Sequence, residues 1–343
     1  MLKRIGIYGI LVGLVIIASA SAYVWHFWQE QPLAFDEPVT ITVEPGASLG
    51  RVAARLEGEG IVASALELRL LARIENKAHA IKAGEYRVEP GITLAGLLDK
   101  LVAGDVVQYE FTIVEGMNWR ELRAKLLAEP ALVDTISGMS DAEVMAALGE
   151  SELHPEGQFL PETYRFTRGT TDLEFLARAH EDLQTALATA WDERVDGIPL
   201  DSPYEALILA SIIEKETGIP SERREIAGVF TRRLIKGMRL QTDPTVIYGL
   251  GEDYTGDIRY RDLRTDTPYN TYTRGGLPPT PIAMAGVAAI EAAVDPAEGK
   301  TLYFVATGDG GHVFSETLDE HNRHVRRYQM TRRPLDEDRG DGE

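Results

Sequence analysis

The sequence contains no cysteine, and it has few basic residues relative to acidic ones. Without cysteine, the chain cannot form a disulfide bond, a thiolate metal site or a cysteine nucleophile. The 35 lysines and arginines stand against 54 aspartates and glutamates, which gives a formal net charge of -19. Because binding to nucleic-acid backbones relies on clustered basic residues, this balance argues against a nucleic-acid partner. An uncharged ligand, such as a sugar polymer, is compatible with it.

Histidine is scarce too, with seven residues in the chain. His321 and His324 form the only regularly spaced pair near His312. Because a zinc site needs three or four ligands at characteristic spacings, we expect no metal and no other cofactor. The composition is otherwise that of a globular protein, since 343 residues with 44% hydrophobic content can build two domains with real cores.

A long uncharged run at residues 5–28 follows Lys3 and Arg4 directly. It is long enough to cross a bilayer as one helix, and the positive end should stay in the cytoplasm. Small residues at 18–22 leave a cleaved signal peptide as the alternative, but the apolar run continues past them for too long to be a signal core. The sequence therefore predicts an uncleaved anchor at residues 1–28. The aromatic residues at its far end are typical of an interfacial belt: Trp25, Phe27 and Trp28.

An internal repeat follows a short, proline-containing segment at residues 29–38 that is typical of a linker. VEPGASL at residues 43–49 is echoed by VEPGITL at residues 88–94, and VEGMNW at residues 114–119 is a weaker third copy. Each copy predicts a strand, a glycine turn, a Ser, Thr or Asn N-cap, and then an amphipathic helix.

The first two copies, with a predicted helix near residues 64–74 between them, resemble the small βααβ module called LysM. That module binds polymers of N-acetylglucosamine, and the resemblance covers residues 39–107. A structural α/β spacer explains the repeat equally well, so both interpretations stay open.

The remainder predicts a larger mixed domain at residues 151–330, joined to the repeat by a connecting region at residues 108–150. Helices are expected at residues 134–150, 172–191, 203–217, 223–235 and 283–294, and strands at residues 302–306 and after the glycines at 310–311. Residues 240–245 should form a polar loop, residues 269–281 a long irregular segment, and residues 331–343 a disordered tail. The predicted fold class is α+β: a transmembrane helix, a small LysM-like α/β subdomain and a larger mixed α+β domain.

The helix expected at DSPYEALILASIIEKET, residues 201–217, delivers a carboxylate onto its own apolar face. At 100° per residue, Glu216 shares a side with Ile212 and Ile213, whereas Glu214 points nearly opposite. Gly218 ends the helix directly afterwards, which places Glu216 at a mouth that a substrate could reach. Such a carboxylate either reaches water past a frayed helix end or keeps its proton in a partly dry cleft.

Five separated motifs occur behind the anchor in one order: PEGQFLPETY, SIIEKET, RLQTDPTVIYGLG, YNTYTRGGLPPTPIA and LYFVATGDGGHVFSETLDEHN. Together they closely resemble the endolytic murein transglycosylases of the MltG or YceG type, over nearly the whole chain to about Tyr328. The resemblance implies cleavage of the β-1,4 bond between N-acetylmuramic acid and N-acetylglucosamine, leaving 1,6-anhydromuramic ends. It also implies that residues 151–330 are a YceG-like catalytic domain and that Glu216 is the catalytic glutamate. Glu162 departs from some relatives, which carry Asp there.

This chemistry can be performed by one carboxyl group. Ordinary glycoside hydrolases pair an acid with a second carboxylate, whereas a lytic transglycosylase needs no water, because the muramyl 6-hydroxyl attacks its own anomeric carbon. Glu216 would protonate the leaving oxygen and then act as base toward that hydroxyl, and burial would raise its pKa enough to keep it protonated near neutral pH. Glu214 is interpreted as the partner of an ion pair rather than as a catalytic group.

Further polar residues in these motifs are candidates for binding the substrate. Amide, hydroxyl and aromatic side chains could bond or stack on sugar rings, although turns and buried tyrosines explain them too. Glu156 is also a candidate auxiliary carboxylate, with a helix cap or a salt bridge as the alternative. The predicted substrate-binding residues are Glu156, Tyr164, Gln241, Thr242, Asp243, Tyr248, Asn270, Tyr272 and His312.

The leading hypothesis is a lytic transglycosylase of the bacterial inner membrane, with a cytoplasmic N-terminus and a periplasmic catalytic domain. Its expected partner is the peptidoglycan glycan strand, and penicillin-binding proteins or other cell-wall synthases are further candidates. One alternative is a non-catalytic glycan-binding scaffold that recruits cell-wall synthases. Another is a water-using muramidase in which Glu156 or Asp243 assists Glu216.

Overall fold

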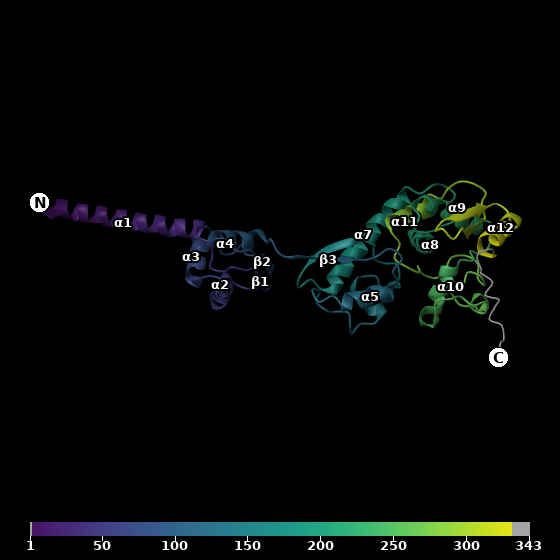
Figure 1. The fold of residues 1–343 in the computed structure, drawn as a ribbon, viewed down its shortest axis with the longest axis horizontal. Helices are drawn as coiled ribbons and strands as arrows, with labels where there is room; N and C mark the ends of the chain where they lie inside the picture. The colour runs from purple at the N-terminus through teal and green to yellow at the C-terminus, as the bar shows by residue number, and fades with distance from the viewer. Residues whose placement is uncertain (1, 331–343) are drawn as a thin grey trace, which may run out of the picture. The chain divides into compact units, whose positions relative to one another are not determined.

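The computed structural model describes residues 2–330, so the tail predicted to be disordered, residues 331–343, lies outside the described residues. The chain divides into two compact units, which are Met1–Glu110 with Arg165–Thr170, and Phe111–Tyr164 with Thr171–Glu343. Both units combine helices with short, two-stranded sheets (Figure 1). The prediction of an α+β fold is therefore confirmed. The second unit includes residues 111–150, which the sequence predicts as a separate connecting region.

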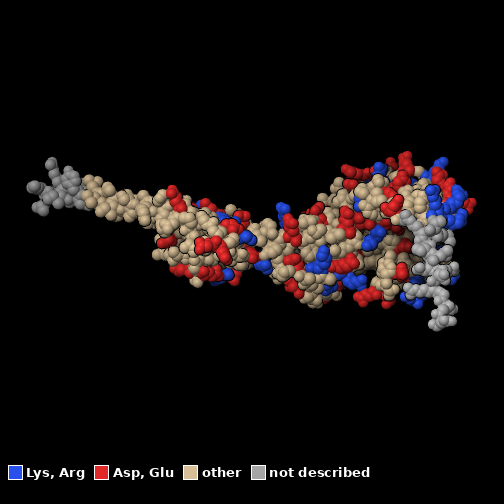
Figure 2. All heavy atoms as spheres, viewed as in Figure 1, with Lys and Arg blue, Asp and Glu red and all other residues tan. Residues whose placement is uncertain are grey.

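The first unit begins with helix α1 (Leu2–Glu30), whose segment Leu11–Glu30 is long and apolar enough to cross a membrane. Figure 2 shows no basic or acidic side chain along the described part of this helix before it reaches the globular part of its unit. Trp28 is 6% exposed and packs in the core of the unit, whereas Trp25 and Phe27 are exposed. The helix therefore ends inside a folded unit.

The segment predicted as a linker, residues 29–38, is held against this unit. The Gln29 side chain donates a hydrogen bond to Glu75 at 3.3 Å, and the Leu33 N–H donates to the Ile92 carbonyl at 2.8 Å. Leu33 and Phe35 also pack on the core of the unit. Because hydrogen bonds and apolar contacts fix it, this segment does not act as a free spacer.

The rest of the first unit has the order β1, α2, α3, β2, α4 and places the two repeat copies in matching positions. Strands β1 and β2 pair antiparallel, with Val39 opposite Val88. The Ser48 and Thr93 side chains accept N–H bonds from Arg51 and Gly96, so the N-caps predicted for both copies are confirmed. The bounds are Val39–Val43, Leu49–Gly58, Ala65–Ile74, Gly84–Val88 and Leu94–Ala103.

The second unit starts with the third copy of the repeat, where Asn118 forms a capping box with Glu121 at the start of α5. The helix predicted over residues 134–150 is shorter than expected, since α6 covers only Asp141–Ala147. The boundary between the two units runs through strands β3 and β4. These strands and the helices near them in the sequence have the bounds Gln108–Thr112 (β3), Trp119–Leu127 (α5), Thr163–Thr167 (β4) and Asp172–Asp192 (α7).

Helix α8 (Pro203–Glu216) lies at the centre of the second unit, packed by α7, α9, α10 and α11. All residues from Ala206 to Ile213 are buried, so this stretch of the helix is covered on every side. The side opposite Glu216, toward which Glu214 is predicted to point, therefore packs against other helices as well. The neighbouring helices are α9 (Arg223–Ile235), as predicted, α10 (Asp243–Leu250) and α11 (Val287–Val294).

Two elements differ from the sequence prediction for local reasons. Helix α11 starts only after Gly286, because Met284 makes backbone hydrogen bonds with Gly116 and Met117 and stays extended. The loop predicted at residues 240–245 ends at Thr242, and its last three residues open α10, with Pro244 in the first turn, where a proline is tolerated.

The chain then forms a hairpin of β5 (Tyr303–Ala306) and β6 (His312–Ser315), as predicted, with Ala306 opposite His312. Helix α12 (Leu318–Val325), which the sequence analysis missed, follows and packs on both strands. Short turns of other helix types complete this unit at Pro220–Glu222, Gly251–Asp253, Asp262–Arg264 and Arg326–Met330.

Candidate active site

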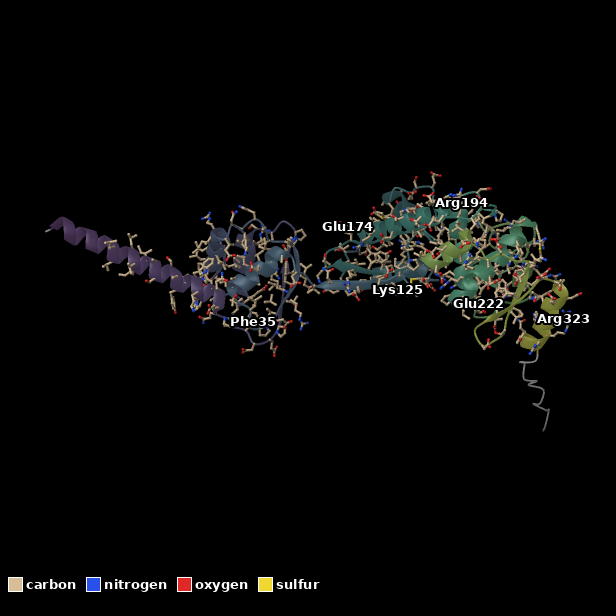
Figure 3. The ribbon with its side chains drawn as sticks, turned by 90° about the horizontal axis from the view of Figure 1, so that it is seen from above. Phe35, Lys125, Glu174, Arg194, Glu222 and Arg323 are labelled. Carbon is tan, nitrogen blue, oxygen red and sulfur yellow. The ribbon has the colours of Figure 1, made fainter. Side chains whose placement is uncertain are left out.

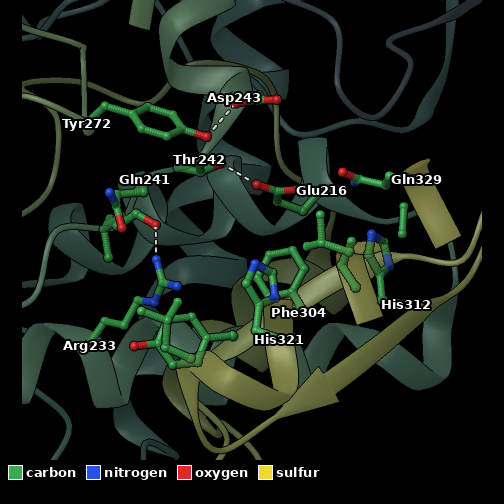
Figure 4. A pocket seen from close by; sticks show the side chains of 16 residues that line it. Glu216, Arg233, Gln241, Thr242, Asp243, Tyr272, Phe304, His312, His321 and Gln329 are labelled. Carbon is green, nitrogen blue, oxygen red and sulfur yellow. Dashed lines mark hydrogen bonds between the residues drawn. The ribbon is translucent and has the colours of Figure 1, made fainter. Parts of the chain in front are cut away.

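Glu216 is the last residue of α8 and lines a cavity of about 430 Å³. The helix starts at Pro203, as predicted, with Ser202 as its N-cap, and it ends because Thr217 is extended. Five of the predicted substrate-binding residues line the same cavity (Figure 4): Gln241, Thr242, Asp243, Tyr272 and His312.

The Glu216 carboxyl is partly buried in this cavity, and its burial raises its pKa to about 7. The hydrogen bond that it accepts from the Thr242 hydroxyl lowers the pKa, while the nearby Asp243 charge raises it. The charges of His312 and Arg233 lower it further, by a smaller amount. Burial outweighs these partners, so Glu216 keeps its proton to a much higher pH than an exposed glutamate does.

A cluster of buried threonines fixes the hydroxyl that contacts Glu216. The Thr242 N–H donates to Thr271 Oγ1 at 3.1 Å, and Thr245 Oγ1 donates to the Thr242 carbonyl at 2.7 Å. Gln241, the residue before Thr242, has a φ of 52°, a left-handed backbone conformation that residues other than glycine rarely adopt. The loop is therefore held in one conformation that points Thr242 at the carboxyl.

His312 also lines the cavity and is fixed by Glu222, which is labelled in Figure 3. Glu222 Oε1 accepts the His312 backbone N–H at 2.8 Å, and Oε2 lies 2.8 Å from His312 Nδ1. With Nδ1 held by the carboxylate, the other ring nitrogen is the one left for a ligand.

Asp243 and Tyr272 form a second pair in the cavity, since the Tyr272 hydroxyl donates to Asp243 Oδ1 at 2.6 Å. Burial, followed by this contact with Asp243, raises the pKa of Tyr272, so the phenol stays protonated. Asp243 offers a hydrogen-bond acceptor and Tyr272 an aromatic face, and both line the same cavity as Glu216.

Glu214 has a structural role. Its side chain is 4% exposed, lies 3.7 Å from Arg223 and accepts the Gly286 N–H at 3.1 Å. The interpretation as an ion-pair partner is confirmed. It ties α8 to the starts of α9 and α11.

Glu156 and Tyr248 line a different cavity of about 650 Å³ in the same unit. Burial raises the pKa of Glu156 to about 7, although the Trp119 N–H lies 3.1 Å from each carboxylate oxygen and the Tyr248 hydroxyl also contacts it. Trp119 is the first residue of α5, so Glu156 occupies a helix N-terminus, as the capping alternative supposes.

Gly157, next to Glu156, shows why the PEG motif needs glycine. Its φ is 77°, and an added Cβ would lie 2.4 Å from a side-chain carbon of Pro281. Two motifs far apart in the sequence therefore meet at this glycine.

Tyr164 and Asn270 are not among the residues that line either cavity. The Tyr164 hydroxyl donates to the Leu160 carbonyl at 3.0 Å, and its ring packs edge-on against Phe175. Asn270 is 1% exposed and donates to the carbonyl of Thr265 at 2.7 Å. Their contacts are those of packing and of turn formation.

Arg233 lines the Glu216 cavity although sequence reasoning missed it. It is 7% exposed, donates to the Leu240 and Leu302 carbonyls, and lies over the Tyr303 ring. A signal was present, because Arg233 is seven residues after Ile226 and three after Phe230, on the buried side of α9. His321, which the sequence analysis considered only as a metal ligand, lines this cavity too, and for Glu222, which holds His312, we find no comparable signal.

Among the described residues, no three His, Asp or Glu side chains are arranged to hold a metal ion. What the cavity offers is one carboxyl group of raised pKa with fixed neighbours. Such an arrangement can transfer a proton to and from a bound substrate.

Known proteins were compared with the chain. The YceG-like family matches residues 41–327. The chain belongs to the YceG-like family. It is 31% identical over 307 residues to a Bacillus subtilis (strain 168) protein named endolytic murein transglycosylase, with 84% of each chain covered. The predicted family is thereby confirmed.

Two further relatives of this family member extend the comparison. A Streptococcus pneumoniae protein of the same name is 26% identical over 357 residues, which cover 92% of this chain and 63% of the relative. The crystal structure of a YceG-like protein from Listeria monocytogenes shares 30% of residues at a TM-score of 0.51 and covers 84% of this chain and 99% of that one.

Proposed function

We infer that this family member is a lytic transglycosylase that cleaves the bond between N-acetylmuramic acid and N-acetylglucosamine within glycan strands. The names of its relatives support the reaction class, and the predicted residue Glu216 supports the mechanism. One observation carries the proposal, namely a carboxyl group whose pKa is raised to about 7 at the wall of a cavity.

In this mechanism, Glu216 protonates the oxygen that leaves the anomeric carbon. The muramyl 6-hydroxyl then attacks that carbon from within the same sugar, and the ionised Glu216 accepts the hydroxyl proton. The glycosidic bond breaks, the 1,6-anhydro bond forms, and Glu216 ends with its proton restored. The Thr242 hydroxyl keeps the carboxyl in place through both steps.

The muramidase alternative stays open because Asp243 lines the same cavity as Glu216 and could activate a water molecule. Glu156, its other proposed partner, lines a different cavity. Mass spectrometry of the products from purified glycan strands separates the two reactions. Anhydro ends lack one water relative to hydrolytic ends, and a product mixture of hydrolytic ends alone would refute the transglycosylase.

The scaffold alternative is tested by the same digest. Full-length protein that binds strands but produces no new muramyl ends would favour a non-catalytic scaffold. Glu216→Gln protein is the matched control, because cleavage at the same rate as in the wild type would indicate a contaminant.

We further propose that α1 anchors the protein in the inner membrane, with the rest of the chain on the periplasmic side. The apolar segment Leu11–Glu30 and the preceding Lys3 and Arg4 support this orientation. Protease added to spheroplasts should then digest the body of the protein. A mature protein whose N-terminus lies near Ala22 would instead indicate a cleaved signal peptide.

The LysM-like role of residues 39–107 is also a proposal. It is supported by the βααβ order and by a cavity of about 530 Å³ between α3 and the loops before α2 and β2, lined by Leu66, Arg69 and His79. Deleting the subdomain should weaken cleavage of intact strands more than cleavage of short soluble fragments. An equal loss on both substrates would favour the structural spacer.

A further inference from the structure

The cavity that contains Glu156 adjoins the same two helix ends as the Glu216 cavity. At the end of α8, Lys215 lines the Glu156 cavity and Glu216 lines the other. At the start of α10, Pro244 lines the Glu156 cavity and Asp243 lines the other. Because consecutive residues of α8 and of α10 line different cavities, the two cavities are neighbours on either side of these helix ends. A polymer bound at Glu216 therefore has a second cavity beside it.

The walls of the Glu156 cavity are rich in aromatic rings. Four aromatic side chains line it: Trp119, Tyr248, Tyr254 and Tyr269. The rings of Tyr248 and Tyr269 contact each other edge-on, with centroids 4.8 Å apart. Aromatic rings with polar tips suit a ligand that has both apolar faces and hydroxyl groups.

The basic groups on this wall are already paired. Lys215 Nζ donates to the Gly116 carbonyl at 3.0 Å, and Arg120 lies 3.1 Å from Glu252. A ligand with free carboxylates would have to displace one of these contacts.

The acidic groups are likewise engaged. Asp141 accepts bonds from the Trp119 indole at 2.8 Å and from Arg123 at 2.7 Å, and Glu121 belongs to the capping box of α5. Burial lowers the pKa of His154 and raises that of Glu156 to about 7, so in both groups burial disfavours the charged form. The cavity therefore favours a neutral ligand over a charged peptide.

We propose that the Glu156 cavity is a second glycan subsite, which holds an uncharged N-acetylated sugar unit of the strand that is cleaved at Glu216. This assignment rests on the proposed function. It gives the enzyme a hold on the strand away from the reacting bond, as internal cleavage requires. Because the contact is the same before and during bond cleavage, it contributes to KM and not to kcat.

Two opposite changes test the subsite in the full-length protein. Ile247→Trp fills the cavity, and Tyr254→Ala removes one of its aromatic side chains. The Tyr254 hydroxyl donates to the Gly256 carbonyl within the same loop. Each should raise KM for long glycan strands on the order of threefold to tenfold, with kcat within about twofold of the wild type. Tyr260→Ala is the matched control, because Tyr260 is 72% exposed and lines neither cavity.

A binding measurement makes the test independent of catalysis. In Glu216→Gln protein, calorimetry with chitohexaose should show weaker binding once Ile247→Trp or Tyr254→Ala is added. Unchanged KM and unchanged chitohexaose binding in both folded variants would overturn the subsite. If the KM effect disappears after the stem peptides are removed from the strands, the cavity holds peptide and the sugar assignment is wrong. If the wild type makes no anhydro ends but the binding effects remain, the proposed function fails and the subsite stands.

Discussion

Glu216 and Glu156 are two carboxyl groups of one folded unit that burial brings to the same pKa, about 7, in different surroundings. Glu156 faces the backbone N–H of Trp119 at a helix start and the Tyr248 hydroxyl, whereas Glu216 accepts one hydroxyl bond among the described residues. A raised pKa alone therefore does not identify a catalytic acid. The difference lies in the partners, because a carboxyl that caps a helix cannot give up that contact to a substrate at little cost.

The comparison predicts its largest effect for matched replacements of the two glutamates. Glu216→Gln keeps the shape but removes the transferable proton, so cleavage should fall about a hundredfold or more. Glu156→Gln keeps a neutral group in its cavity and should reduce kcat by less than about threefold. Initial rates of anhydro-end formation measure both, and the reverse ranking would move the acid to the other cavity.

Glu214→Gln is the control on α8 itself. Its carboxylate pairs with Arg223 and accepts the Gly286 N–H, so the variant should lose stability more than activity. We expect a lower unfolding midpoint by circular dichroism, with kcat within about threefold of the wild type at a temperature where both are folded. Loss of activity in folded Glu214→Gln would contradict the division of roles on this helix.

Thr242→Val should change both the rate and its pH dependence. The Thr242 hydroxyl bond lowers the pKa of Glu216, so its loss should raise that pKa and move the alkaline limb of kcat/KM to higher pH. A poorly held carboxyl should also lower kcat on the order of tenfold. Thr242→Ser should restore both. A reduced rate with an unmoved limb would mean that Thr242 acts only in folding.

Glu222→Ala should have a smaller effect of the same sign. Without this carboxylate, the His312 ring is free to turn, and the His312 charge that lowers the pKa of Glu216 acts less strongly. The alkaline limb should move upward by less than in Thr242→Val, with a loss of rate of about threefold to tenfold. Kinetics at several pH values measure the shift, and a downward shift would contradict this electrostatic role.

The smallest effect concerns stability. The folded pKa of Glu216, about 7, lies above its ordinary value of 4.5, so the stabilising contribution of the protonated group is lost as the pH rises through about 7. At about pH 8, Glu216→Gln should be more stable than the wild type by about 1 to 3 kcal/mol, and the difference should shrink at about pH 5. Denaturant titrations at both pH values measure it. A difference that grows at low pH would mean that the carboxylate is stabilised when charged.

Much of the fold follows from local patterns in the sequence. N-cap residues such as Ser48, Thr93 and Ser202 and the apolar periodicity predict where helices begin, because caps and amphipathic faces depend on neighbours in the chain. The same logic locates α8 but does not show that other helices cover its far side, and it fails for residues 283–286, where Met284 makes backbone bonds with Gly116 and Met117. Long-range contacts decide these cases, and no local pattern reports them.

The candidate site divides in the same way. The helical wheel and the motif both lead to Glu216, and the loop residues Thr242 and Asp243 lie in its cavity. No local pattern could show that Glu156 and Tyr248 line another cavity, or that Glu222 meets His312 across 90 residues of sequence. These pairings depend on how α8, α10 and the β5–β6 hairpin come together in space.

The protonation of Glu216 itself can be measured by infrared difference spectroscopy between about pH 6 and about pH 8. A Glu156→Gln background removes the other carboxyl of similar pKa, and Glu156→Gln combined with Glu216→Gln identifies the band that remains. If Glu216 is the acid, a protonated carboxyl band should disappear with a midpoint of about 7, together with the alkaline fall of kcat/KM. A band that is already lost with a midpoint near the ordinary value of 4.5 would contradict the role of Glu216 as proton donor.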